Sequence, residues 1–138
     1  MTGPRRQARE SALQILYMWE VGGAAPQAAI DAYFATHRPD ATLAVVEFAS
    51  ALVVGTIADI ASLDETIEQH SKNWRLDRLA VIDRLILRMS VWELRHDAGT
   101  PPAAILNEAL ELARLFSTEE AVRFINGVLD AVRKAATT

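Results

Sequence analysis

Apolar residues recur along this chain at spacings of three and four positions, which is the period of an α-helix with one buried side. No stretch shows a convincing alternation with the period of two that marks a half-buried β-strand. Proline, glycine and short polar stretches interrupt the helical pattern and divide it into segments joined by short connections, as in a helical bundle. The pattern predicts an all-α protein of about seven helices, at about 4–20, 26–36, 42–61, 62–72, 77–96, 101–116 and 117–134.

Two of the predicted helix starts carry the signature of a capping box. In this motif a serine oxygen and a glutamate side chain, three residues apart, satisfy free amide groups in the first helical turn. The signature occurs as SLDE at 62–65 and as STEE at 117–120. The first predicts a bend at Ser62 that separates the third helix from the fourth, and the second predicts that the last helix starts at Ser117.

The composition fits a globular protein of a reducing cytoplasm. The 138 residues suit one domain, or two tightly joined halves, and 51% of them are hydrophobic, which is enough for a core. No apolar run is long enough to span a bilayer, and the first apolar stretch is too interrupted for a signal peptide. The absence of cysteine excludes disulfides and thiolate chemistry. At a net charge of −4, binding of nucleic acid would require a local basic patch.

The first predicted helix begins with three arginines, Arg5, Arg6 and Arg9. On a helical wheel they lie over the same stripe as Leu13 and Leu16, whereas a merely solvated set would more often point away from it. We therefore expect them at the edge of the bundle, beside the end of a neighbouring helix. Two roles fit this position. The arginines could cap a neighbour's carbonyls or pair with glutamate, which the wheel alone favours, or they could anchor a phosphate backbone.

The segment 77–96 places charges among apolar positions. Asp83 and Glu93 fall on the apolar face, and the arginines Arg84, Arg88 and Arg95 form a narrow basic stripe. Because a buried unpaired carboxylate is unfavourable, each carboxylate should pair with an internal arginine or face a partner protein. An internal pair is the favoured interpretation for either one.

The last predicted helix contains Gly127 at its middle, which destabilises a helix by roughly 1 kcal/mol relative to alanine. Such a glycine is expected where another helix crosses closely, which we favour, or where a ligand backbone approaches. Phe124 lies near the boundary of the apolar face, and Asn126 faces outward. Aromatic side chains at such positions can stack on unpaired bases, although most aromatic residues here belong to the core.

Motifs of enzyme chemistry are lacking in this sequence. There is no glycine-rich phosphate loop and no nucleophile elbow, and the three histidines are isolated, without the spacing of a zinc site. We therefore expect a binding protein with no catalytic residues, no metal and no cofactor.

A family resemblance is carried by four segments, RRQARESALQILYMWE, NWRLDRLAVIDRLILRMSVWEL, PPAAILNEALELARLFS and VRFINGVLD. Together they resemble the NusB family of bacterial transcription antitermination factors, in that family's order and over almost the whole chain. The resemblance implies a NusB-like fold of two small three-helix bundles, about 1–75 and 76–138, within a single domain that covers 1–138.

The resemblance also implies a function in transcription rather than in catalysis. Family members bind the single-stranded boxA segment of ribosomal RNA leader transcripts together with NusE, which is also a small-subunit ribosomal protein. The pair joins the antitermination complex of RNA polymerase and promotes read-through of rRNA operons, in the cytoplasm and without a membrane. The alternative is a protein-only adaptor or homodimer of the same fold, in which RNA binding is weak or masked.

Motif position carries the family's contact residues over to this chain. The resemblance implies RNA contacts at Arg5, Arg6, Arg9, Phe124 and Asn126. It implies contacts with the protein partner at Asp83, Tyr17 and Arg88.

Overall fold

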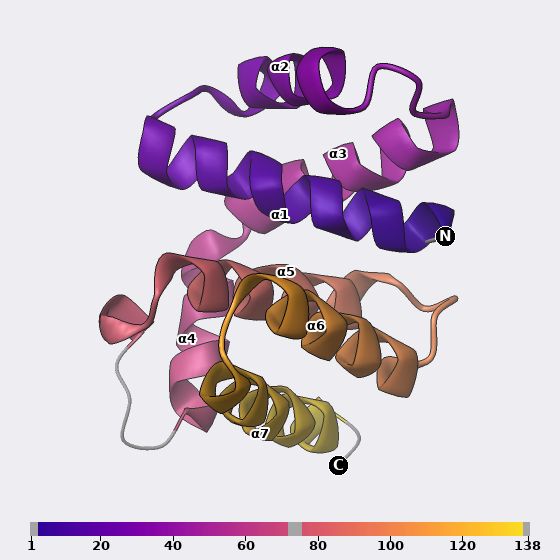
Figure 1. The fold of residues 1–138 in the computed structure, drawn as a ribbon. Helices are drawn as coiled ribbons and strands as arrows, with labels where there is room; N and C mark the ends of the chain where they lie inside the picture. Colours follow the sequence, from indigo (N-terminus) through magenta and orange to yellow (C-terminus); the bar gives the residue numbers. More distant parts are fainter. Residues whose placement is uncertain (1–2, 72–75, 137–138) are drawn as a thin grey trace. The chain divides into compact units, whose positions relative to one another are not determined.

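The structure, a computed structural model, describes residues 3–71 and 76–136, and every regular element within them is helical (Figure 1). The predicted all-α fold class is confirmed. The α-helices are α1 Pro4–Gly22, α2 Pro26–His37, α3 Leu43–Ala58, α4 Ile60–His70, α5 Val81–His96, α6 Pro102–Phe116 and α7 Glu119–Ala136. A short 3₁₀ helix, Leu76–Arg78, precedes α5.

The chain divides into two compact units, Met1–Ala58 and Asp59–Thr138. The sequence placed this division near residue 75, about one helix later. The difference arises because α4 packs against α5 and α7, so that it belongs to the second unit. The first unit therefore contains α1, α2 and α3, and the second contains α4 to α7.

In the first unit, α1 packs against both α2 and α3 (Figure 1). Pro4 opens α1, where its missing N–H would have no partner within the helix. Gly23 ends α1 in the left-handed conformation, with φ of 73°, and its N–H bonds the Trp19 carbonyl. The buried apolar residues of these helices include Ala12, Leu13, Leu16, Ile30, Tyr33, Ala49, Leu52 and Val53.

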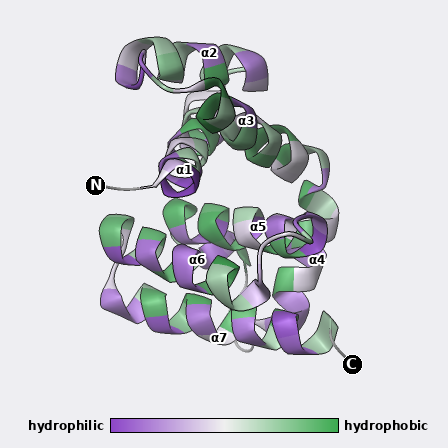
Figure 2. Ribbon diagram, turned by 90° about the vertical axis from the view of Figure 1, so that its right-hand side faces the viewer, coloured by the Kyte–Doolittle hydropathy of each residue, from purple (hydrophilic) through white to green (hydrophobic). Residues whose placement is uncertain are grey.

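Not every apolar residue of α3 is buried. Leu43 is 72% exposed and Ala51 is exposed. Figure 2 shows that α3 is hydrophobic along most of its length. Because apolar residues occur on every side of α3, periodicity alone does not select the side that packs. Packing on α1 selects the side with Val45, Ala49, Leu52 and Val53.

The predicted bend at Ser62 is wrong by a few residues. Helix α3 ends at Ala58 and α4 begins at Ile60, so that Ser62 lies inside α4. The Ser62 hydroxyl accepts a hydrogen bond of 3.0 Å from the Arg95 guanidinium instead of capping a helix. Helix α4 ends at His70, and residue Lys72, where its end was expected, lies outside the described residues.

The predicted cap of the last helix is displaced by one residue. The Thr118 hydroxyl, not that of Ser117, accepts a hydrogen bond of 3.1 Å from the Ala121 N–H and caps α7. The Ser117 hydroxyl donates to the Asp83 carboxylate on α5. A tertiary contact therefore uses the side chain that the local pattern assigned to capping.

Helix α5 is the central element of the second unit, since it packs against α4, α6 and α7. All of its residues from 85 to 91 are buried.

Among the described residues no single helix has the length and apolar composition needed to span a bilayer. Helices α3 and α4 meet those criteria only when they are taken together across the break between them.

Gly127 does not mark a close helix crossing, contrary to the favoured interpretation of the sequence. It is exposed on α7, and a Cβ atom built on it would meet no other atom within 4 Å. The space beside this glycine is therefore open.

We expect Gly127→Ala to raise the free energy of unfolding by up to about 1 kcal/mol, because alanine has the higher helix propensity and no clash arises. Urea titration followed by circular dichroism measures the change. Gly23→Ala is the matched control and should lower stability, because alanine is disfavoured at a φ of 73°. A destabilised Gly127→Ala protein would contradict the open environment.

Candidate functional site

Two arginines of α1 stack on one aromatic ring of α3. The Arg5 guanidinium carbon lies 4.3 Å from the centroid of the Phe48 ring, and that of Arg9 lies 5.3 Å from it. Arg5 and Arg9 are four residues apart, so the helix places them on one face. Both distances are within the range of cation–π attraction. We call Arg5, Arg6, Arg9 and Phe48 the arginine–phenylalanine cluster; the contacts of Arg5 and Arg9 with Phe48 define its geometry.

The three arginines differ in their exposure. Arg9 is only 5% exposed, Arg6 is half-buried and Arg5 is exposed, and all three make interactions within the structure. The sequence predicted their position beside a neighbouring helix, and the first turns of α3 are that neighbour. The contact with the Phe48 ring was not predicted, because it joins residues of two different helices.

A pocket of about 350 Å³ lies beside Arg5 and is lined by Pro4, Arg5, Ala44, Glu47 and Phe48. Sequence reasoning missed Glu47 as well as Phe48. One signal was available, because Glu47 is the only charged residue in the otherwise apolar and hydroxyl-bearing sequence of α3. A single carboxylate on such a helix indicates a surface position.

The predicted RNA-contacting residues of α7 belong to the second unit. Phe124 is half-buried, whereas Asn126 and Gly127 are exposed. One turn further along α7, hydrogen bonds from Arg133 and Lys134 lower the pKa of the half-exposed Asp130 carboxylate. The stretch 124–127 of α7 therefore combines a half-buried aromatic residue, an exposed amide and open space beside a glycine.

Asp83 pairs with a hydroxyl group rather than with an arginine. Its carboxylate accepts a hydrogen bond of 2.5 Å from Ser117, which joins the start of α5 to the end of α6. Asp83 is half-exposed, so that part of it faces solvent. Glu93, by contrast, is 2% exposed and does have an interaction within the structure. The two carboxylates therefore have different environments.

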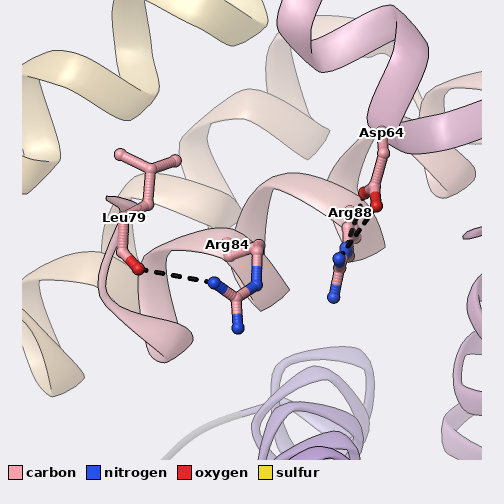
Figure 3. Close-up of polar contacts among 4 residues, drawn as sticks. All are labelled: Asp64, Leu79, Arg84 and Arg88. Carbon is pink, nitrogen blue, oxygen red and sulfur yellow. Dashed lines mark hydrogen bonds and ion pairs between the residues drawn. The ribbon is translucent and has the colours of Figure 1, made fainter. Parts of the chain in front are cut away.

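Arg88 forms an ion pair inside the second unit (Figure 3). Its Nε and Nη2 atoms donate to the two carboxylate oxygens of Asp64 at 2.7 and 2.9 Å, and its side chain is 8% exposed. Arg84, one turn earlier on α5, donates to the Leu79 carbonyl at 3.5 Å. The bidentate pair links α5 to α4, so Arg88 is internal, whereas Tyr17 on α1 is 42% exposed.

Metal ligands do not gather among residues 3–71 and 76–136, where no group of three His, Cys, Asp or Glu side chains could hold an ion. The features that stand out for binding are thus the arginine–phenylalanine cluster, the pocket beside it, the exposed stretch of α7 and the half-exposed Asp83.

Comparisons with known proteins agree on one family. A family model described as the NusB family matches residues 6–134. The chain is 45% identical over 130 residues to the transcription antitermination protein NusB of Solibacter usitatus, covering 94% of this chain and 88% of that protein. It is similar to the structure of T. maritima NusB, with a TM-score of 0.87 and 27% identity over 97% of this chain and 93% of that one. A further similar structure is that of the antitermination factors NusB and NusE in complex with double-stranded RNA. The match to one of its chains has a TM-score of 0.87 and 30% identity, and it covers 98% of this chain and 99% of that one.

We expect Asp64→Ala to lower the free energy of unfolding by about 2 to 3 kcal/mol, because it leaves the Arg88 guanidinium buried without its carboxylate. Urea titration measures the loss. The double variant Asp64→Ala/Arg88→Met should recover part of it, because the buried charge is then gone. Asp130→Ala, which breaks an exposed pair, is the control and should change stability little. Equal stability of the Asp64→Ala and wild-type proteins would contradict this role.

Proposed function

Because this chain belongs to the NusB family, whose members are transcription antitermination proteins and not enzymes, we propose that it binds boxA RNA together with NusE. The RNA is the single-stranded boxA segment of ribosomal RNA leader transcripts. The complex acts with RNA polymerase in the cytoplasm and promotes read-through of rRNA operons. The observation that carries this proposal is the arginine–phenylalanine cluster at the start of α1.

The arginine–phenylalanine cluster has the properties of a phosphate-binding site. Guanidinium groups bind phosphate oxygens through charge-assisted hydrogen bonds, and order before binding reduces the entropic penalty of association. Phe48 orders Arg5 from one side by stacking. Arg5 is exposed and Arg6 is half-buried, whereas the buried Arg9 lies against the same Phe48 ring as Arg5. We therefore assign phosphate contacts to Arg5 and Arg6 and a supporting role to Arg9.

The exposed stretch of α7 supplies contacts of another kind. Single-stranded RNA is recognised by stacking on aromatic side chains and by hydrogen bonds to base edges. Phe124 offers a partly exposed ring for stacking, and Asn126 offers both a donor and an acceptor. The open space at Gly127 allows a nucleotide to approach the α7 backbone.

NusE is the proposed protein partner. A solved structure to which this chain is similar contains NusB and NusE with RNA, which supports the assignment. In the proposal Asp83 and Tyr17 contact NusE, because both are accessible. Arg88 contributes indirectly, by holding α4 on α5 through Asp64.

The double variant Arg5→Ala/Arg6→Ala should weaken binding of single-stranded boxA RNA by at least about tenfold at low salt, because two phosphate contacts are lost. For the wild-type protein the plot of log affinity against log salt should have a slope of about −1.4, from about −0.7 for each of two phosphates on a single strand. The double variant should have a slope near zero. Fluorescence anisotropy with labelled RNA measures both quantities.

Arg114→Ala/Lys134→Ala is the matched control, since it removes two exposed positive charges that do not line the cluster. It should bind RNA as the wild-type protein does. Competition with the same RNA as a duplex separates single-strand recognition from general RNA binding. Unchanged affinity of the Arg5→Ala/Arg6→Ala variant would exclude the assigned RNA site.

Asp83→Asn should weaken binding of NusE about fivefold, because it removes a charge while its amide oxygen can still accept the Ser117 hydrogen bond. Isothermal titration calorimetry with purified NusE measures the affinity. Ser117→Ala removes the internal hydrogen bond but keeps the carboxylate, and it should retain NusE binding. The opposite order of effects would show that Asp83 acts only within the fold.

A further inference from the structure

The pocket beside Arg5 combines flat surfaces with a single carboxylate. Pro4, Arg5 and Phe48 contribute a pyrrolidine ring, a planar guanidinium and an aromatic ring, and Glu47 contributes the carboxylate. Its volume of about 350 Å³ is at the lower end of the range for ligand pockets in proteins. A pocket of this size and lining suits one flat ring system rather than an extended ligand.

Glu47 is the feature that a phosphate-binding site alone does not explain. A carboxylate in the same pocket as Arg5 repels phosphate and so weakens the attraction of RNA to this surface. Glu47 is exposed, and within 3–71 and 76–136 its carboxylate forms no hydrogen bond or ion pair. Its acceptor atoms are therefore available to a ligand, and they differ in kind from everything else that lines the pocket.

We infer that this pocket binds one unpaired guanine base of the RNA, with Glu47 as the residue that selects it. This inference rests on the proposed RNA binding and adds a base-specific subsite to it. The N1–H and N2–H groups of guanine point in the same direction and match the two oxygens of a carboxylate. Adenine and cytosine place a ring acceptor beside their amino group, and uracil has one N–H between two carbonyls, so each repels one carboxylate oxygen.

The base stacks on the guanidinium of Arg5 inside the pocket. Guanidinium planes stack on bases as aromatic rings do, and Phe48 holds this guanidinium 4.3 Å from its ring centroid. The two helices contribute different parts of the proposed base contact. Helix α1 supplies the charge and the stacking plane through Arg5, and α3 supplies the hydrogen-bond acceptors through Glu47.

The test uses four labelled RNA decamers, each of nine uridines with a guanosine, inosine, adenosine or uridine at the fifth position. Fluorescence anisotropy at one low salt concentration gives the four affinities. The wild-type protein should bind the guanosine decamer about tenfold more tightly than the uridine decamer, as expected for a bidentate contact to a base edge. Inosine lacks the N2 amino group, so the inosine decamer should bind with intermediate affinity.

Glu47→Gln should remove the preference for guanosine and leave binding of the uridine decamer unchanged or slightly tighter, because a repulsive charge is lost. Asp31→Asn is the matched control. Asp31 is an exposed carboxylate of α2 outside the pocket, where it accepts a hydrogen bond from Gln27, and the variant should keep the preference. Circular dichroism verifies that both variants are folded.

Each remaining outcome has a defined meaning. Equal binding of all four decamers by the wild-type protein, or a guanosine preference that survives Glu47→Gln, would overturn the guanine subsite and leave the proposed RNA binding intact. Failure of the wild-type protein to bind any of the decamers or boxA RNA would overturn both. A loss of preference in Asp31→Asn as well as in Glu47→Gln would show a general effect of charge and would likewise overturn the subsite.

Discussion

Burial of the Arg88 guanidinium is the constraint on which the second unit depends. Helix α5 packs against three other helices, and its residues from 85 to 91 are all withdrawn from solvent. An unpaired charge in that position would be strongly destabilising, because water no longer solvates it. Asp64 neutralises the Arg88 guanidinium through a bidentate ion pair, and this pair links α4 to α5. Arg95 continues the same side of α5 with hydrogen bonds to Ser62 and Thr66 of α4.

The first unit meets a similar constraint with a different partner. Arg9 is nearly buried, and its guanidinium carbon lies 5.3 Å from the centroid of the Phe48 ring. An aromatic ring attracts a cation to its face and so restricts its orientation. Arg5, which is exposed, lies against the same ring.

Local sequence signals gave correct elements but misplaced several of their ends. The helical period located every helix of the described chain to within a few residues, because burial of one face requires that period. The serines of the two capping signatures, Ser62 and Ser117, instead bond to Arg95 and Asp83 on α5. A hydroxyl can satisfy a helix end or a distant charged group, and the local pattern does not contain the distant group. Thr118, the next residue after Ser117, caps α7 in its place.

Part of the candidate site was predictable from the sequence, and part depends on how the helices pack. The arginine-rich start, its place on the inward stripe of the first helix and the family to which the chain belongs were all readable from the order of residues. The sequence did not predict that Phe48 and Glu47 belong to the candidate site. Apolar residues occur on every side of α3, so its sequence does not select the side that packs against α1. The packing of the helices likewise determines that the space beside Gly127 is open and that Arg88 pairs with Asp64. Periodicity describes one helix at a time, whereas a contact between two helices depends on the rotation and position that packing of both imposes.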